Sequence, residues 1–155
     1  MRNLLTSLPL SIQLLSIFWL LLLTSSCSDK DEVTALPKST MLSQNWQIEV
    51  ATSAYEKVVY QFYKKGRTDN DADLSGYRFT FRSDNSYAIT DGKQSYSGTW
   101  KLTQNDTMIE MDGQDGFKVL TLTEASLVVS FDSEEMDEKG NLLTVTTTYT
   151  LIPVL

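Results

Sequence analysis

The sequence predicts an all-β domain, an eight-stranded up-and-down antiparallel β-barrel. Apolar and polar residues alternate along a succession of short segments, which is the period-2 pattern of half-buried strands. Turn residues such as Asp91-Gly92 separate these segments, and Gly can take the positive φ that a tight hairpin turn requires. Strand–helix–strand alternation is not evident, and closing the meander into a barrel would bury the edges that an open sheet leaves exposed.

The first 26 residues are typical of a secretory signal peptide and are excluded from the fold. Arg2 is the only charged residue before Asp29, and a dense apolar run at 14–23 precedes the small residues 24–26. The alternative is an uncleaved signal anchor, since residues 4–23 are nearly long enough to span a bilayer. Polar residues and Pro9 interrupt the first half of that stretch, which favours cleavage.

Cys27 is the only cysteine, so the chain cannot form an intrachain disulfide. Residues 23–27 resemble a bacterial lipobox, in which the cysteine is acylated and becomes the new N-terminus. Residues 28–32 resemble the acidic export tag of surface lipoproteins in one group of Gram-negative bacteria. The alternative is a reduced cysteine with no role beside a solvated charge cluster. These resemblances imply an outer-membrane lipoprotein of the bacterial envelope, anchored through Cys27, with its exposure at the cell surface left open.

Three segments follow from this: a lipoprotein signal peptide at 1–26, a flexible acidic tether carrying the lipidated Cys27 at 27–40, and a barrel domain at 41–155. Removing the signal peptide takes away only Arg2 from a chain of formal net charge −7, which leaves −8. An acidic surface of this kind argues against nucleic acid as a partner and against binding to anionic membranes through charge. Membrane attachment would therefore depend on the lipid.

The predicted strands share alternating apolar residues and are bounded by turn residues. They lie at 42–50, 77–82, 86–90, 95–102, 106–111, 117–123, 126–131 and 143–152. The segment at 54–64 is ambiguous. Its apolar residues recur at helical spacing, whereas its content of valine and aromatic residues favours a strand. We expect a short helix there that caps one end of the barrel.

A set of short motifs in order resembles the lipocalin-like domain of bacterial secreted lipoproteins, which are calycin-type β-barrels. The set comprises Trp46, the alternating run at 77–81, the phrase Tyr-Ser-Gly-Thr-Trp at 96–100 and the apolar strand from Phe117 to 122. It spans nearly the whole mature chain. The resemblance implies a barrel with an apolar pocket, but the fold alone does not name a ligand.

Non-catalytic binding or carriage of a small apolar or amphipathic molecule is the leading functional hypothesis. The alternative is a filled barrel that serves as an envelope protein–protein interaction module. Candidate ligand-lining residues, which could equally be packed core, are Phe79, Phe81, Tyr87, Ile89, Phe117 and Leu120. Trp46 and Trp100 are predicted to be structural core.

Composition argues against an enzyme and against a cofactor. The chain has no histidine, which removes Ser-His-Asp and Cys-His catalysis, and its carboxylates show no paired pattern. The acidic stretch at 69–76 superficially resembles a calcium loop. It lacks glycine at the sixth position and glutamate at the twelfth, where Leu74 and Thr80 stand, so we expect a solvated loop and no metal site.

Overall fold

The computed structural model describes residues 36–137 and 139–155, which belong to a compact unit, Leu36–Leu155. The predicted signal peptide, Cys27 and most of the predicted tether lie outside the described residues. Within the described ranges the chain forms one short helix and nine strands. They are α2 (Lys38–Leu42), β1 (Asn45–Tyr55), β2 (Val58–Lys64), β3 (Arg78–Phe81), β4 (Ser86–Thr90), β5 (Ser95–Thr103), β6 (Met108–Met111), β7 (Gln114–Leu122), β8 (Leu127–Met136) and β9 (Leu142–Pro153).

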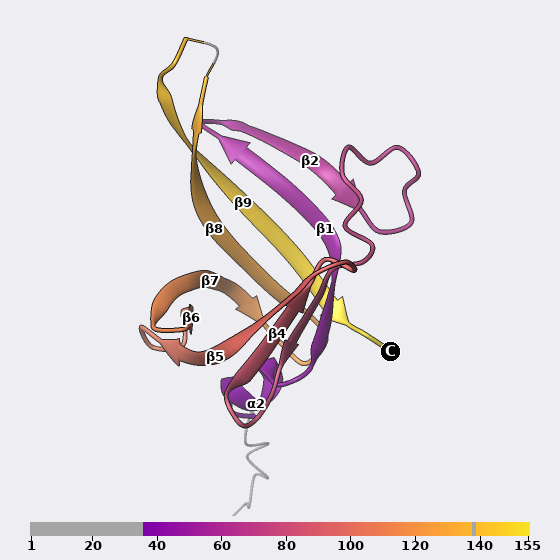
Figure 1. Cartoon of the computed structure of the whole chain (residues 1–155), viewed down its shortest axis with the longest axis vertical. Coiled ribbons are helices and arrows are strands. Elements are labelled where there is room, and N and C mark those ends of the chain that lie inside the picture. The colour runs from indigo at the N-terminus through magenta and orange to yellow at the C-terminus, as the bar shows by residue number, and fades with distance from the viewer. Residues whose placement is uncertain (1–35, 138) are drawn as a thin grey trace, which may run out of the picture. The chain divides into compact units, whose positions relative to one another are not determined.

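Eight of the strands close into an antiparallel up-and-down barrel (Figure 1). Neighbours in sequence pair from β3 to β9, and β1 pairs with both β3 and β9 and so completes the ring. The predicted fold class is confirmed. The ninth strand, β2, stands outside the ring because it pairs only with β1, from Tyr55↔Val58 to Val50↔Lys64.

The prediction of a short helix at 54–64 is wrong, because this segment forms the end of β1 and all of β2. β1 runs on to Tyr55, a two-residue turn follows, and β2 returns along β1 as an antiparallel hairpin. The register of this hairpin shifts at Phe62, where β2 has one residue more than β1. Such a bulge interrupts the period-2 alternation, so Tyr60 and Tyr63 lie on the same side of the sheet at a spacing that imitates a helix.

α2 lies at one end of the barrel, which we call the closed end (Figure 1). The helix begins inside the stretch predicted as tether, and its last residue, Leu42, is completely buried. Trp46 fixes it in place, because its indole Nε1 donates a hydrogen bond of 3.0 Å to the Leu42 carbonyl oxygen. Among the residues that the structure describes, no helix has the length and apolar character needed to cross a membrane.

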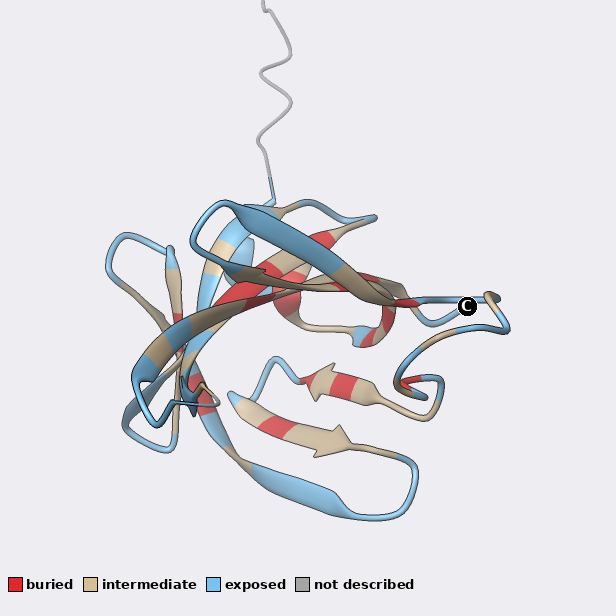
Figure 2. Cartoon of the chain, turned by 90° about the horizontal axis from the view of Figure 1, so that it is seen from above, coloured by how far each residue is buried: buried red, intermediate tan, exposed pale blue. Residues whose placement is uncertain are grey.

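At the opposite end, the open end, the β1–β2 and β8–β9 hairpins extend beyond the closed ring (Figure 1). β8 pairs with β7 only as far as Ser130, whereas its pairing with β9 continues to Met136. β1 likewise pairs with β3 only over residues 45–47. The upper parts of β2, β1, β9 and β8 therefore form an extended sheet, in that order, and the hairpin ends that it carries are exposed (Figure 2).

Candidate functional site

The closed end of the barrel is packed with large apolar side chains. Trp46 and Ile109 are fully buried, Phe81 is 2% exposed and Trp100 is 3% exposed. The rings of Phe81 and Trp100 meet edge to face at 5.7 Å, and the Trp100 indole donates to the Arg82 carbonyl oxygen at 3.1 Å. Edge-to-face packing and a satisfied indole N–H both fix these rings in place, so side chains fill this half of the interior.

Four aromatic rings meet across the middle of the barrel, and we call them the aromatic quartet. Phe79 comes from β3, Phe117 from β7, Phe131 from β8 and Tyr149 from β9. Each ring contacts two others, with centroids 5.5–6.2 Å apart and interplanar angles of 59–74°. Phe79 is buried, but the other three rings remain partly exposed although they face the interior. The quartet therefore forms a floor that separates the packed half from an accessible half.

The inner face of the extended sheet continues from the aromatic quartet toward the open end, since Phe131 belongs to β8. Cross-strand pairing places Tyr60, Ser53, Thr147 and Phe131 in one row across β2, β1, β9 and β8. Beside that row lies an open depression of about 370 Å³, one of several of similar volume on the described residues. It is lined by Ser53, Ala54, Tyr55, Val58, Tyr60, Glu135 and Val145. We call this surface, together with the quartet beneath it, the open-end trough.

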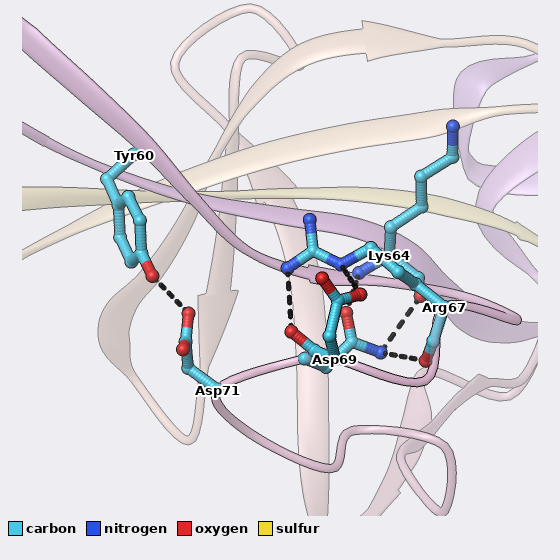
Figure 3. A network of polar contacts seen from close by, with 6 residues as sticks. Tyr60, Lys64, Arg67, Asp69 and Asp71 are labelled. Carbon is cyan, nitrogen blue, oxygen red and sulfur yellow. Dashed lines mark hydrogen bonds and ion pairs between the residues drawn. The ribbon is translucent and has the colours of Figure 1, made fainter.

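The loop after β2 supports one wall of the trough (Figure 3). Asn70 holds the loop against the end of β2, because its side chain accepts from the Lys64 amide at 2.8 Å and donates to the Lys64 and Arg67 carbonyl oxygens. The Tyr60 hydroxyl donates to the Asp71 carboxylate, which raises the pKa of Tyr60. The loop thereby fixes the position of a tyrosine ring whose side chain is otherwise largely exposed.

A family model for the lipocalin-like domain matches residues 42–129, which is more than half of the chain. The chain belongs to the lipocalin-like domain family. No curated protein matches it. The matched range ends just after the start of β8, and β9 completes the lipocalin-like barrel by pairing with β8 and β1.

The lipocalin-like barrel divides the predicted ligand-lining residues between its two halves. Phe79 and Phe117 belong to the aromatic quartet. Phe81 and Tyr87 lie in the buried core cluster, and Ile89 packs against that cluster while partly exposed. Trp46 and Trp100, predicted as structural core, are both buried at the closed end.

Leu120 does not join the other predicted residues, because its side chain is 50% exposed. It occupies a bulge in the β7–β8 pairing, between Val119↔Val129 and Thr121↔Val128. The extra residue lets Val119 and Leu122 both pack against the core, three positions apart, with Leu120 between them turned to solvent.

Several residues of the trough were not predicted from the sequence. Phe131 and Tyr149 lie on the inward-facing positions of the predicted strands at 126–131 and 143–152. The alternation of inward and outward residues could therefore have identified them. Tyr55, Val58 and Tyr60 had no such signal, since they were assigned to a helix.

Asp112 has a structural role that its acidic, glycine-rich surroundings do not reveal. Its carboxylate accepts from the Thr99 amide at 2.8 Å and from the Tyr87 hydroxyl at 2.7 Å, and these hydrogen bonds lower the pKa of Asp112. The carboxylate lies directly over Gly98, so a Cβ atom at that position would clash with Oδ1. Gly98 is therefore required by the close approach of this side chain. No cluster of three potential metal-ligating side chains occurs in the ranges described.

Proposed function

We propose that the domain binds and carries, without catalysis, a small apolar or amphipathic molecule in the open-end trough. The observation that carries this proposal is the partial exposure of three rings of the aromatic quartet. Phe117, Phe131 and Tyr149 face a concave interior and yet remain partly accessible to water. Covering exposed apolar rings with a ligand removes apolar surface from water, which favours binding. Small-molecule sites are lined mainly by apolar and aromatic side chains.

The chemistry of the trough supports binding rather than catalysis. The chain has no histidine, and among the residues that the structure describes Glu135 is the one carboxylate in the lining of the cavity. The Ser53 hydroxyl in the lining is suited to orienting a polar end of a ligand, whereas the Tyr55 and Tyr60 hydroxyls already donate to Glu56 and Asp71. The remaining lining residues, Ala54, Val58 and Val145, are aliphatic.

Native mass spectrometry of the unit 36–155, purified without exposure to detergent, tests this proposal. The unit contains all the described strands and the whole buried core cluster, so it carries the contacts that its fold requires. We expect a small molecule to co-purify in stoichiometric amount and to be lost from the Phe131→Ala variant. A clean apo mass, with no gain in melting temperature across a panel of lipids and neutral amphiphiles, would overturn the proposal.

We further propose that the protein is a lipoprotein of the bacterial outer membrane, held there by acylation of Cys27. Support comes from the sequence alone: the apolar run before Cys27, the lipobox-like residues 23–27 and the acidic residues 28–32. Metabolic labelling with a fatty-acid analogue should tag the wild-type chain in the membrane fraction and leave Cys27→Ala unlabelled. Equal labelling of the two chains would contradict the assignment of Cys27.

Docking of an envelope protein is a second candidate function, and the edge of β2 favours it. β2 pairs with a strand on one side only, and Val58, Val59 and Tyr60 are 68%, 69% and 55% exposed. An exposed apolar edge strand can accept a strand from a partner. A photo-crosslinking residue at position 59 should then give one discrete adduct in cells, and Val59→Lys should abolish binding of that partner without changing the binding of a small ligand.

A further inference from the structure

Among the described residues, Glu135 is the acidic side chain in the lining of the open-end trough, whose other members are aromatic, aliphatic and hydroxyl-bearing. Glu135 lies on the same side of β8 as Phe131, because residues two and four apart in a strand share a face. It pairs in register with Leu143 of β9 and lines the cavity with Tyr55, Val58 and Tyr60. No ion pair to Glu135 occurs among the residues that the structure describes, so its charge is not neutralised by a described lysine or arginine.

The surroundings of Glu135 are themselves negative. The sequence from 132 to 143, between the middle of β8 and the start of β9, contains five carboxylates and one lysine. The end of the β1–β2 hairpin, which carries Tyr55, lies close enough to Asp137 to be affected by its charge. Desolvation and the neighbouring carboxylates of Glu56 and Asp137 raise the pKa of Tyr55. With Glu56 and Lys57 of the β1–β2 turn included, carboxylates outnumber lysines around the two hairpin ends, so their net charge is negative and favours cations over anions.

Tyr55 and Tyr60 add a second feature that favours a cation. Both rings belong to the lining of the cavity that contains Glu135. The face of a tyrosine ring attracts an ammonium group through the quadrupole of its π-system. A carboxylate accompanied by tyrosine rings is therefore a suitable environment for a substituted ammonium, which cannot satisfy a dense set of hydrogen-bond acceptors but can contact aromatic faces.

The apolar part of such a ligand would lie below the charged mouth. Glu135 and Phe131 are separated by four residues of β8, about 13 Å along the strand. Phe131 contacts Phe117 and Tyr149 in the quartet, and all three rings are partly exposed. Glu135 with its tyrosine neighbours and the quartet ring of Phe131 therefore lie on one face of β8, at a separation that a medium-length alkyl chain can span.

We propose that the ligand of the open-end trough is a cationic amphiphile, with a substituted ammonium head against Glu135, Tyr55 and Tyr60 and an alkyl chain on the aromatic quartet. This inference rests on the proposed function and narrows its ligand class. Charge complementarity selects the head group, while burial of the chain on the quartet supplies most of the affinity.

Competition with a neutral fluorescent probe tests the inference. The unit 36–155 is first saturated with N-phenyl-1-naphthylamine and then titrated, below their micelle concentrations, with decyltrimethylammonium, decyl maltoside and decyl sulfate. Each competitor carries the same ten-carbon alkyl chain, and the three differ in the head group and its charge. We expect decyltrimethylammonium to bind at least about fivefold more tightly than decyl maltoside, since an exposed ion pair and a cation–π contact are individually modest. Decyl sulfate should bind most weakly.

Two variants locate the preference. Glu135→Gln should clearly reduce the preference for decyltrimethylammonium over decyl maltoside and leave only the contribution of the tyrosine rings, and added salt should weaken the wild-type preference. Glu134→Gln is the matched control, because Glu134 is the neighbouring residue of β8 and faces the opposite side of the sheet. It removes the same charge without changing the trough and should leave the preference nearly intact.

The outcomes separate this inference from the function on which it rests. If the probe and all three amphiphiles fail to bind, the proposed carrier function is overturned. If they bind with equal affinity, or if Glu135→Gln retains the wild-type preference, the trough is a binding site but the cationic ligand class is wrong. If Glu134→Gln and Glu135→Gln lose the preference equally, general negative charge rather than Glu135 selects the head group, and the assignment of Glu135 is overturned.

Discussion

Truncating one aromatic ring in each half of the barrel should cost very different amounts of stability. Phe81 is 2% exposed and is enclosed at the closed end, so Phe81→Ala leaves a cavity and should lower the free energy of unfolding by about 3–5 kcal/mol. Phe131 is partly exposed and contacts Phe117 and Tyr149 at 5.7 and 5.5 Å. Its removal opens a wall that already borders solvent, so the loss should be about 1–2 kcal/mol, mainly from those two ring contacts.

Urea unfolding of the unit 36–155, followed by circular dichroism, measures both values. For a domain of this size each kcal/mol corresponds to a shift of about 4 °C in melting temperature, which provides an independent check. The urea dependence of the unfolding free energy should be the same for both variants and the wild type. Equal losses for Phe81→Ala and Phe131→Ala would refute the division of the barrel into a packed half and an accessible half.

Three further predictions concern residues outside the trough. Gly98→Ala should destabilise the fold because its Cβ displaces the Asp112 carboxylate, and a double-mutant cycle should show the same change costing little in Asp112→Ala. The hydrogen bonds that lower the pKa of Asp112 add stability above its ordinary pKa of 3.8, and this stability is lost as the pH falls through the lowered value. Asp112→Asn should therefore be less stable than the wild type at pH 7, and this difference in the free energy of unfolding should disappear at acidic pH. Leu120→Ser should change the free energy of unfolding by less than about 0.5 kcal/mol, because Leu120 is exposed. A loss as large as that of a core leucine would contradict its placement in the bulge.

The central strands could be predicted from sequence because their structure is set by local patterns. In the run 77–102 the alternation of rings with polar residues fixes the inner face, and the turn at Asp91-Gly92 fixes the hairpin. β3, β4 and β5 lie within or close to the predicted ranges. Gly92 has a φ of +89°, as the turn required.

The incorrect predictions, a helix at 54–64 and an inward-facing Leu120, result from β-bulges and from pairing between distant segments. At Phe62 one extra residue breaks the alternation of β2, so the apolar spacing imitated a helix. At Leu120 another bulge turns a leucine outward that hydrophobicity alone assigns to the interior. A bulge depends on the partner strand, and that partner is not visible in the local sequence.

The trough could not be predicted for a related reason. Its floor brings together Phe79 and Tyr149, which are far apart in the chain, and its walls exist because β8 extends beyond its pairing with β7. Alternation identifies several aromatic residues of the interior, but it cannot distinguish the enclosed rings from the accessible ones.

Nuclear magnetic resonance of the ¹⁵N-labelled unit 36–155, with and without a saturating neutral apolar ligand, can locate the binding site at the open or the closed end. The indole N–H groups of Trp46 and Trp100 report on the closed end, where they donate to the Leu42 and Arg82 carbonyl oxygens. If the ligand binds at the open end, the amide signals around Phe131 and Tyr149 should shift and both indole signals should stay in place. Large shifts of the indole signals, with the signals of Phe131 and Tyr149 unchanged, would contradict binding at the open end.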